Sequence, residues 1–288
     1  MKILITGSKG QLGRELQELS PDFPQYNFLY TDVEELDITN EEKVKEFFAV
    51  NKPDVVINCA AYTAVDKAET DESPAYLINA TAVGILARVS SSENAFLIHI
   101  STDYVFDGKR YIPYKETDET TPVSVYARSK NAGETAVNQN TDRAIIIRTS
   151  WLYSAFGNNF VKTILRYGKE RGSLNVVSDQ IGSPTYARDL AETILKILPR
   201  AIQTNNIQLF HYSNEGVSSW YDFAKAIVEI SCISCRINQI GTKDYPLPAA
   251  RPFYSVLDTS KLKEKFEIEI PYWRDSLRHC IQRLESKE

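Results

Sequence analysis

The spacing of hydrophobic residues alternates between two periods along the first half of the chain. Short, nearly continuous apolar runs predict strands that are buried on both faces: "KILITG", "YNFLYTD", "PDVVINCAAY", "AFLIHIST" and "RAIIIRTS". Between them, "QLGRELQEL" and "NEEKVKEFFAVN" have helical spacing, and Asn40 is placed to cap the second helix. We also expect a long helical stretch from about Glu69 to Ser92 and a helix around Tyr126. Strands that alternate with helices predict βαβ units and a parallel sheet, so the fold class is α/β.

The regular alternation of predicted strands and helices ends after about Trp151. "GNNFVKTILRYGKE" and "ARDLAETILKIL" predict helices, "LNVVSD" predicts a strand between them, and the tail contains aromatic, proline-rich loops followed by short helices. No low-complexity linker separates the two halves. We therefore expect a doubly wound domain over residues 1–150, with the chain returning to it at about 173–202, and a smaller lobe built from residues 151–172 and 203–288.

Composition narrows the class of protein. The chain has 288 residues, of which 43% are hydrophobic and 25% charged, as in a soluble globular protein. A net charge of -5 argues against nucleic acid as a partner. The absence of a long apolar run argues against a membrane span, and the N-terminus does not resemble a signal peptide, so we expect a cytoplasmic protein. The four cysteines suggest no disulfide framework, and we interpret the C-x-x-C formed by Cys232 and Cys235 as chance.

A glycine-rich turn follows the first predicted strand. The segment "GSKGQLG" opens a predicted helix, and it differs by one position from the G-x-G-x-x-G fingerprint of dinucleotide-binding domains. Glycines let the backbone approach a pyrophosphate, which then lies at the helix N-terminus. In this context a dinucleotide site is favoured over a plain turn, and the first domain is then of Rossmann type. The expected contacts are Gly7, Gly10, Gln11, Leu12 and Gly13.

Acidic residues follow the second predicted strand. Asp32 is placed to accept hydrogen bonds from the adenosine ribose, and a carboxylate there points to NADH because it repels a 2'-phosphate. Lys9 and Arg14 could instead hold that phosphate, so the choice between NADH and NADPH stays open. Asp37 and Ile38 could frame the adenine, with a turn acceptor as the alternative role of Asp37.

The candidate catalytic groups converge at the carboxyl ends of the strands. Thr102 follows a buried strand, and Tyr126 and Lys130 lie one helical turn apart on the next helix. A surface helix with a solvated lysine is the ordinary interpretation of such a pair. In the crevice beside a nicotinamide, however, Tyr126 could give a proton to a ketone oxygen while Thr102 donates a hydrogen bond to it. We expect the Lys130 ammonium to lower the pKa of the Tyr126 phenol and to hold the nicotinamide ribose.

With "GSKGQLG", "STDYVFDG" and "YARSK" in place, the chain resembles the extended short-chain dehydrogenase/reductase family. Within that family, "DVVINCAAYTAVDKAE", "RTSWLYS", "DQIGSPT", "SWYDFA" and "RPFYSVLD" resemble, in order, stretches of the branch that reduces the 4-keto group of dTDP-4-dehydro-L-rhamnose. The resemblance implies NADPH or NADH as cofactor and a dTDP-linked keto sugar as substrate, whose product, dTDP-L-rhamnose, serves polysaccharide biosynthesis. It leaves a homodimer open.

Two alternatives accompany this resemblance. One is another nucleotide-sugar reductase or an epimerase, which would not consume the cofactor. The other is a non-catalytic regulatory subunit similar to that of methionine adenosyltransferase. Retention of Thr102, Tyr126 and Lys130 together argues against a regulatory protein.

The resemblance also implies roles for particular residues. Thr102, Tyr126 and Lys130 match the family's catalytic groups. The glycine turn, Asp37 and Ile38 match the family's cofactor site, and so do Ala60, Ala61 and Tyr62. The positions that match the substrate site, with core aromatics or a surface arginine as the plainer interpretation of some, are Thr63, Val65, Thr102, Tyr104, Phe106, Trp151, Asn159, Gln180 and Arg251.

Two positions depart from the family's pattern. Ala127 follows the catalytic tyrosine where many relatives have glycine. Some relatives bind magnesium between subunits through acidic side chains. Glu15 fits one such position but Arg188 occupies another, so magnesium is doubtful here and we expect no metal site.

Overall fold

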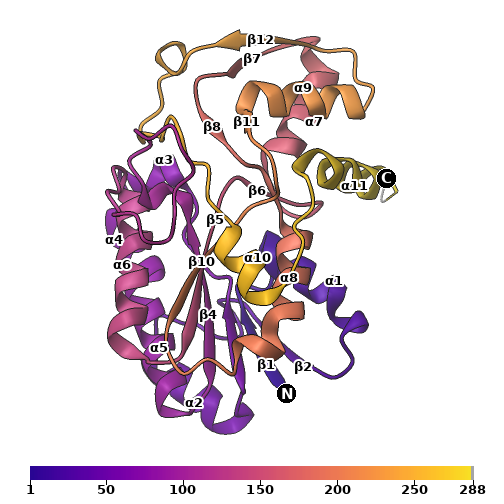
Figure 1. Cartoon of the computed structure of the whole chain (residues 1–288). Helices are drawn as coiled ribbons and strands as arrows, with labels where there is room; N and C mark the ends of the chain where they lie inside the picture. Colours follow the sequence, from indigo (N-terminus) through magenta and orange to yellow (C-terminus); the bar gives the residue numbers. More distant parts are fainter. Residues whose placement is uncertain (287–288) are drawn as a thin grey trace.

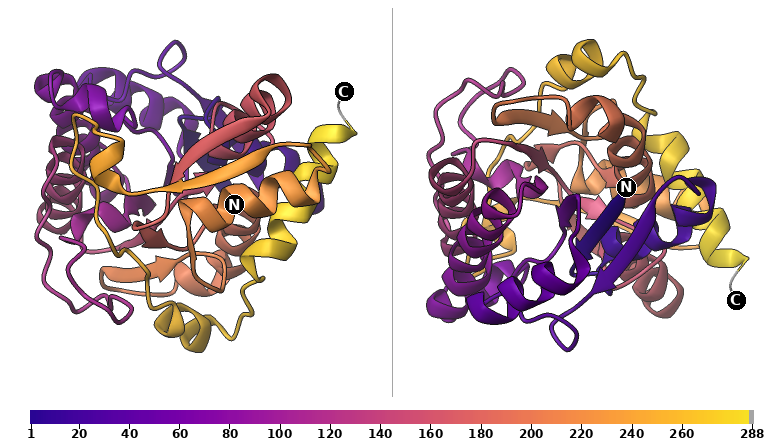
Figure 2. Two further views of the ribbon diagram at one scale, coloured as in Figure 1. Left: turned by 90° about the horizontal axis from the view of Figure 1, so that it is seen from above. Right: turned by 90° about the horizontal axis from the view of Figure 1, so that it is seen from below.

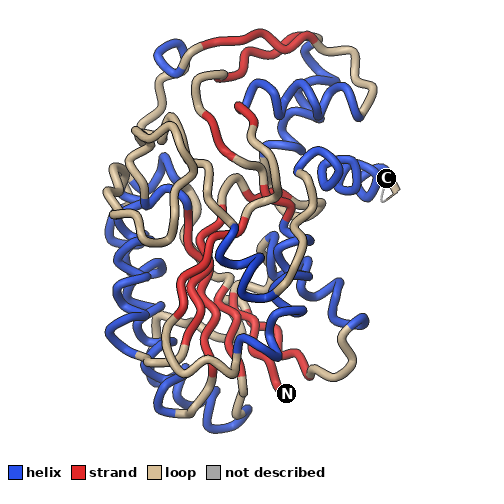
Figure 3. The backbone as a smooth tube through the Cα atoms, viewed as in Figure 1, coloured by secondary structure: helices blue, strands red, loops and turns tan. Residues whose placement is uncertain are grey.

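The computed structural model describes residues 1–286, and its centre is a six-stranded parallel sheet (Figures 1 and 3). The strands are β1 (Lys2–Thr6), β2 (Asn27–Thr31), β3 (Val55–Asn58), β4 (Phe96–Thr102), β5 (Ala144–Thr149) and β10 (Gln208–Tyr212). Their order across the sheet is β10-β5-β4-β3-β1-β2, and every pairing is parallel. The α/β fold that the alternating pattern predicts is confirmed.

Helices cover both faces of the sheet because successive strand residues point to opposite sides. In β1, the fully buried Ile3 and Ile5 pack toward one helical layer, while Leu4 packs toward the other. The first layer, to the right of the sheet in Figure 1, consists of α1 (Gln11–Leu19), α8 (Ala187–Ala201) and α10 (Ser260–Phe266). The second layer, to the left, consists of α2 (Glu41–Asn51), α5 (Ala82–Ser92) and α6 (Val125–Asn140).

The sheet has a switch point between β1 and β3. From β1 the chain continues outward to β2 on one side, whereas β3, β4 and β5 follow on the other. Loops that leave the carboxyl ends of adjacent strands in opposite directions open a crevice, which is where ligands bind in doubly wound folds. The glycine turn after β1 and the loop after β3 both lie there.

A smaller lobe packs beyond the carboxyl ends of the strands. Its helices and strands are α7 (Phe160–Arg171), α9 (Trp220–Ile230), α11 (Trp273–Glu285), β7 (Ser173–Val177) and β12 (Arg236–Ile240). β7 and β12 pair in parallel, and the core below them contains the buried Tyr153, Phe223 and Leu277. Short two-stranded pairings complete the lobe: β6 (Leu152–Tyr153) with β9 (Thr185–Tyr186), and β8 (Ile181–Gly182) with β11 (Ser218–Ser219). Seen from above in Figure 2, this lobe lies over the end of the sheet.

The structure corrects three parts of the expected division of the chain. α10 falls in the stretch assigned to the smaller lobe, but it packs on the central sheet. β7 falls in the stretch expected to return to the first domain, but it pairs with β12 in the smaller lobe. β10 falls in the stretch assigned to the smaller lobe, but it extends the central sheet beside β5. The hydrophobic pattern of a short strand does not specify its partner, which explains the error at β7, whereas β10 lies in a stretch where no strand was predicted.

The long helix expected from Glu69 to Ser92 is interrupted. α3 (Val65–Ala68) and α4 (Glu72–Tyr76) precede a π-helical turn over 77–81, and α5 then continues to Ser92. The wider turn brings the Asn79 carbonyl against α6, where a β-carbon at Gly133 would lie 2.1 Å from its oxygen. The expected cap of α2 is confirmed, since Asn40 Oδ1 accepts a hydrogen bond from the Lys43 amide at 3.2 Å. In residues 1–286 no helix is long and apolar enough to traverse a bilayer.

Candidate active site

The glycine turn forms the floor of the crevice. Gly7 has φ +63°, and a β-carbon there would lie 2.6 Å from the Ala60 amide nitrogen, so this position needs glycine for both its dihedral and its packing. A β-carbon at Gly13 would lie 2.6 Å from the Gly7 carbonyl oxygen, so glycine is also required where α1 approaches β1. The N-terminus of α1 has no side-chain cap and no acidic residue in its first turn. Its backbone N–H groups therefore suit a pyrophosphate, and the turn fits a dinucleotide.

A cavity of about 360 Å³ extends from this turn over the ends of β1, β2 and β3. The predicted cofactor residues that line it are Gly7, Gly10, Asp32, Asp37, Ile38, Ala60 and Ala61. Asp32 Oδ2 accepts a hydrogen bond from the Lys9 amide at 3.0 Å, while the Lys9 ammonium pairs with Glu34. Asp37 Oδ1 accepts hydrogen bonds from the amide and hydroxyl of Thr39, which is the turn-acceptor role left open for it.

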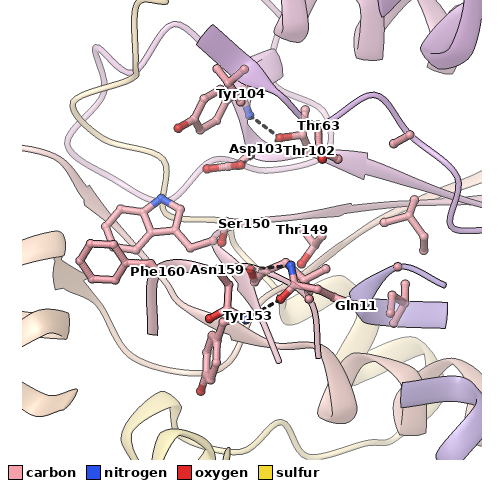
Figure 4. Close-up of a pocket in the computed structure, with 18 of the residues that line it drawn as sticks. Gln11, Thr63, Thr102, Asp103, Tyr104, Thr149, Ser150, Tyr153, Asn159 and Phe160 are labelled. Carbon is pink, nitrogen blue, oxygen red and sulfur yellow. Dashed lines mark hydrogen bonds between the residues drawn. The ribbon is translucent and has the colours of Figure 1, made fainter. Parts of the chain in front are cut away.

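The main cavity, of about 560 Å³, opens at the carboxyl ends of β4 and β5 (Figure 4). It shares Gly10 and Ala61 with the smaller cavity, so the two form one continuous crevice. The other predicted residues that line the main cavity are Gln11, Leu12, Gly13, Thr63, Val65, Thr102, Tyr104, Tyr126, Lys130, Trp151 and Asn159. In Figure 4, Asn159 points toward Gln11, and its Nδ2 donates to Gln11 Oε1 at 2.9 Å.

Helix α6 delivers the phenol and the ammonium to this cavity. Ser124 caps the helix by accepting a hydrogen bond from the Ala127 amide at 3.2 Å, so Tyr126 lies in the first turn, close to the end of β4. Lys130 lies one turn later, is 2% exposed, and donates from Nζ to the Ile100 carbonyl oxygen at 2.7 Å. Thr102 ends β4. The three expected catalytic groups therefore face the same cavity.

The expectation that Lys130 lowers the pKa of Tyr126 is wrong for the protein without a bound cofactor. Burial raises the pKa of the Tyr126 phenol to about 12, outweighing a hydrogen bond with Thr102 that lowers it. Lys130 does not offset this burial, because its ammonium is directed to a backbone carbonyl. Burial also lowers the pKa of Lys130 to about 8. Tyr126 is thus held in its protonated form, as a proton donor requires.

Asp103 is a further acid at the site. Its side chain is 2% exposed, and its Oδ1 accepts a hydrogen bond from Thr102 Oγ1 at 3.1 Å. Burial raises the pKa of this carboxyl to about 7, with opposing contributions from hydrogen bonds to Ser255 and Thr102. Asp103 therefore orients the hydroxyl of Thr102 and titrates near neutrality.

Two of the expected site residues lie elsewhere. Phe106 is fully buried, stacks on Tyr114 with ring centroids 4.1 Å apart, and lines none of the cavities described here, so the expected sugar-facing role has no support in its position. The Tyr62 hydroxyl donates to Asp71 at 3.2 Å, and its backbone pairs with the Asn79 amide. Tyr62 therefore anchors the loop after β3 and lines neither part of the crevice.

A third cavity, of about 720 Å³, lies in the smaller lobe between α7, β7 and β12. Arg251 and Gln180 line it, and Phe160 and Trp220 line both this cavity and the main one. Arg251 donates to both carboxylate oxygens of Asp66, at 2.7 and 3.0 Å. It is therefore a buttressed guanidinium facing a cavity, and not a free surface arginine.

Sequence reasoning missed several residues of the main cavity. Thr149 ends β5 and Ser150 follows it, so the rule that ligands bind at strand ends could have found them. Trp220 and Phe160 begin α9 and α7, far along the chain, and no local pattern indicates that they meet. The Trp151 and Trp220 rings stack with centroids 3.7 Å apart. Trp151 itself adopts a left-handed φ of +47°.

The residues around Glu15 do not fit magnesium. Glu15 is fully buried and accepts hydrogen bonds from Arg283 Nη1 at 2.9 Å and from Ser154 Oγ at 2.6 Å, with Arg188 3.6 Å away. Guanidinium groups thus surround the carboxylate where a cation would bind. No group of three or more His, Cys, Asp or Glu side chains suited to a metal occurs within residues 1–286.

Comparison with known proteins decides the family. The family model described as the RmlD substrate binding domain matches residues 1–286. The chain belongs to this family. A protein of Aggregatibacter actinomycetemcomitans named dTDP-4-dehydrorhamnose reductase is 43% identical to this RmlD-family chain over 286 residues, which cover 96% of the chain and 97% of the relative. A protein of the same name from Burkholderia thailandensis is 41% identical, with full coverage of both.

Solved structures agree with the RmlD-family assignment. The crystal structure of a dTDP-4-dehydrorhamnose reductase from Clostridium acetobutylicum superposes with a TM-score of 0.93, at 44% identity, covering 99% of this chain and all of that one. The enzyme of the same name from Bacillus anthracis, solved in complex with NADP, gives a TM-score of 0.92 at 40% identity and covers 98% of this chain and 99% of that one.

Proposed function

We propose that this protein reduces the 4-keto group of dTDP-4-dehydro-L-rhamnose, using NADPH or NADH, to give dTDP-L-rhamnose. The observation that carries this proposal is the meeting of Thr102, Tyr126 and Lys130 at one cavity whose floor is the glycine turn. The full-length similarity to proteins named for this reaction supports the same substrate.

The cofactor would be held along the crevice. The α1 N-terminus and the glycine turn suit the pyrophosphate, and Asp32 and Ile38 lie where the adenosine half would bind. When bound, the reduced nicotinamide supplies a hydride. A relative solved with NADP supports this class of cofactor.

The protein's own groups then handle the proton and the charge. Tyr126 gives its proton to the ketone oxygen, which needs it once the carbon is reduced. Thr102, whose hydroxyl donates to Asp103 in this structure, would turn its one hydrogen to the same oxygen as negative charge grows on it. To stabilise the phenolate that Tyr126 leaves behind, the Lys130 ammonium would have to leave the Ile100 carbonyl and turn toward the phenolate oxygen, where opposite charges attract strongly in a buried site.

The sugar and the nucleotide would occupy different cavities. Thr63, Val65, Tyr104, Trp151 and Asn159 line the main cavity and would surround the sugar. The adjoining cavity of the smaller lobe, with Arg251 and Gln180 in its wall, would hold the dTDP portion. The chain thus divides its work between a cofactor-binding sheet domain and a substrate-binding lobe.

The test is a coupled assay of the purified protein with dTDP-4-dehydro-L-rhamnose and each nicotinamide, followed by the loss of reduced-nicotinamide absorbance. Tyr126→Phe should still bind NADPH but turn over at least about 100-fold more slowly, as expected when a general acid is removed. Near-normal turnover in that variant would refute the role of Tyr126. Interconversion of sugars without net cofactor consumption would instead indicate an epimerase.

A further inference from the structure

Glu134 continues the face of α6 that carries the catalytic pair. Tyr126, Lys130 and Glu134 are spaced four residues apart, so they lie along one side of the helix, against β4. Lys130 is 2% exposed and Glu134 is 6% exposed. A buried carboxylate one helical turn from a buried ammonium needs a physical explanation, since ionised groups are seldom buried without a partner.

The Glu134 carboxylate is held from two strands at once. Arg148 on β5 donates from Nε to Oε1 at 2.9 Å and from Nη2 to Oε2 at 2.7 Å. Ser101 on β4 donates to Oε1 at 2.5 Å, and Ser101 immediately precedes Thr102. Glu134 therefore ties α6 to the strand ends from which the catalytic groups project.

The charge of Glu134 also acts on Lys130. Burial lowers the pKa of the Lys130 ammonium to about 8, and the Coulombic effect of Glu134 is the largest contribution that raises it. The other contribution that raises it comes from Cys59, whose own pKa is about 12, so this thiol is neutral near pH 7 and supplies no charge. His99 on β4 also faces Lys130, and burial keeps that imidazole neutral by lowering its pKa.

We propose that Glu134 is a positioning residue whose negative charge, one helical turn away, keeps the Lys130 ammonium charged beside Tyr126. This inference rests on the proposed function, because it assigns Glu134 a part in the same reaction. Arg148 binds both oxygens of the carboxylate, and Ser101 fixes its orientation. The alternative is that the Glu134–Arg148 pair merely holds the fold together.

Glu134→Gln tests the difference, because it removes the charge but keeps the shape of the side chain. The measurements are the pH profile of kcat/KM and the Kd of NADPH, from about pH 6 to about pH 10. Loss of the carboxylate should let Lys130 release its proton at lower pH. The basic limb of both profiles should therefore move down by about one pH unit, with turnover at low pH largely retained.

Glu15→Gln is the matched control, since Glu15 is also a buried glutamate paired with an arginine of another element. It should lower the melting temperature without moving the basic limb. The double variant E134Q/R148Q avoids leaving a buried guanidinium unpaired, so it keeps the test usable if Glu134→Gln does not fold. It should show a smaller shift in the same direction, whereas Glu134→Asp, which keeps the charge, should restore the wild-type limb.

The inference is wrong if Glu134→Gln or the double variant keeps the wild-type basic limb, or if Glu15→Gln moves it equally. These outcomes are separable from failure of the proposed function. An inactive wild-type protein in the coupled assay would refute the function itself, whereas an active one with an unmoved limb would refute only the role of Glu134. The pH dependence of NADPH binding gives a readout that does not depend on the sugar.

Discussion

Single side chains at this site are tuned mainly by burial. Burial holds Tyr126 protonated, weakens the hold of Lys130 on its proton, and brings Asp103 to titrate near neutrality. Each effect arises because a charged group loses solvation when it is surrounded by protein. The chemistry of a proton donor beside a hydride donor therefore depends on how tightly the lobe and the sheet exclude water.

Asp103 should make stability depend on pH. Its folded pKa of about 7 lies above the ordinary aspartate value of 3.8, so the folded state binds the proton more tightly than the unfolded state. The stability associated with the protonated form is complete below the unfolded pKa and is lost as pH rises through the folded pKa. Asp103→Asn, which stays neutral, should therefore be more stable than wild type above pH 7 by about 4 kcal/mol, and little different near pH 4.

Thermal unfolding across this pH range measures the effect. The gap in melting temperature between Asp103→Asn and wild type should open as pH rises. A constant difference in melting temperature would show that the Asp103 carboxyl has the same pKa in the folded and unfolded states. A difference that shrinks as pH rises would show that the folded pKa is lowered and not raised.

Asp32 should influence the choice of nicotinamide. Its carboxylate lines the end of the crevice where we propose that the adenosine binds, and Glu34 and Glu35 pair with the ammonium of Lys9 nearby. Negative charge there disfavours a 2'-phosphate. Asp32→Ala should raise the ratio of kcat/KM for NADPH over NADH about tenfold, equivalent to 1.4 kcal/mol. Steady-state assays with both cofactors provide the measurement, and an unchanged ratio would place the 2'-hydroxyl away from Asp32.

At the scale of helices and strands, the sequence predicts best where the signal is local. α1 begins and ends where its hydrophobic spacing indicates, and α2 is capped by Asn40 as expected. The partner of a short strand is decided by distant residues. This is why the sequence does not indicate that β7 pairs within the smaller lobe, that residues 208–212 extend the central sheet, or that Trp151 meets Trp220.

The same reasoning explains the site. Thr102, Tyr126 and Lys130 could be placed together because each lies at or beside the carboxyl end of a recognisable buried strand. Phe106 lies only four residues after Thr102, yet it turns into the core against Tyr114. Proximity in sequence to a site residue does not determine which way a side chain points.

α11 should stabilise α1 through ion pairs that neutralise Glu15, so that no divalent metal is needed there. Arg283 of α11 bonds to both carboxylate oxygens of the fully buried Glu15 and is also paired with Glu18. Arg283→Ala would leave Glu15 buried with less compensation, so it should lower the free energy of unfolding by about 3 kcal/mol. Chemical denaturation measures this loss. For comparison, Arg278→Ala removes an exposed arginine of the same helix, whose pairing with Asp275 should contribute under about 1 kcal/mol.

Chelation should accordingly change neither turnover nor stability of the wild-type protein, since guanidinium groups already neutralise Glu15. A fall in either on treatment with EDTA, reversed by magnesium, would contradict this account. Arg283→Ala gives a second comparison. If magnesium bound near Glu15, the wild-type protein would respond to EDTA and magnesium, and Arg283→Ala, with its altered ion pairs, would not. If Arg283 takes the place of a metal, neither the wild type nor Arg283→Ala should respond.

At the scale of the whole molecule, the cavities form a row. The crevice runs from the Asp32 end to the main cavity, which shares Gly10 and Ala61 with it. Phe160 and Trp220 then separate the main cavity from that of the smaller lobe. A dinucleotide and a nucleotide sugar are both elongated, so such a row lets them approach each other end to end, with their reacting carbons in the middle.

The Arg251–Asp66 pair connects the two ends of this arrangement. Asp66 belongs to α3, after β3, and Arg251 belongs to the segment that follows β12, so their ion pair spans the sheet domain and the lobe. If Arg251 also meets the diphosphate, Arg251→Ala should raise KM for the dTDP-sugar and the Kd of dTDP at least about tenfold, because a charge-assisted hydrogen bond is lost. The Kd of NADPH should stay the same, since Arg251 lines only the cavity of the smaller lobe.

Asp66→Asn separates charge recognition from buttressing. It keeps Arg251 but weakens its anchor, so it should affect dTDP binding less than Arg251→Ala does. Calorimetric titration of dTDP into each variant, with NADPH titrated in parallel, gives both constants. Equal losses in the two variants would mean that Arg251 acts only by joining the lobes, and unchanged dTDP binding in Arg251→Ala would move the nucleotide out of this cavity altogether.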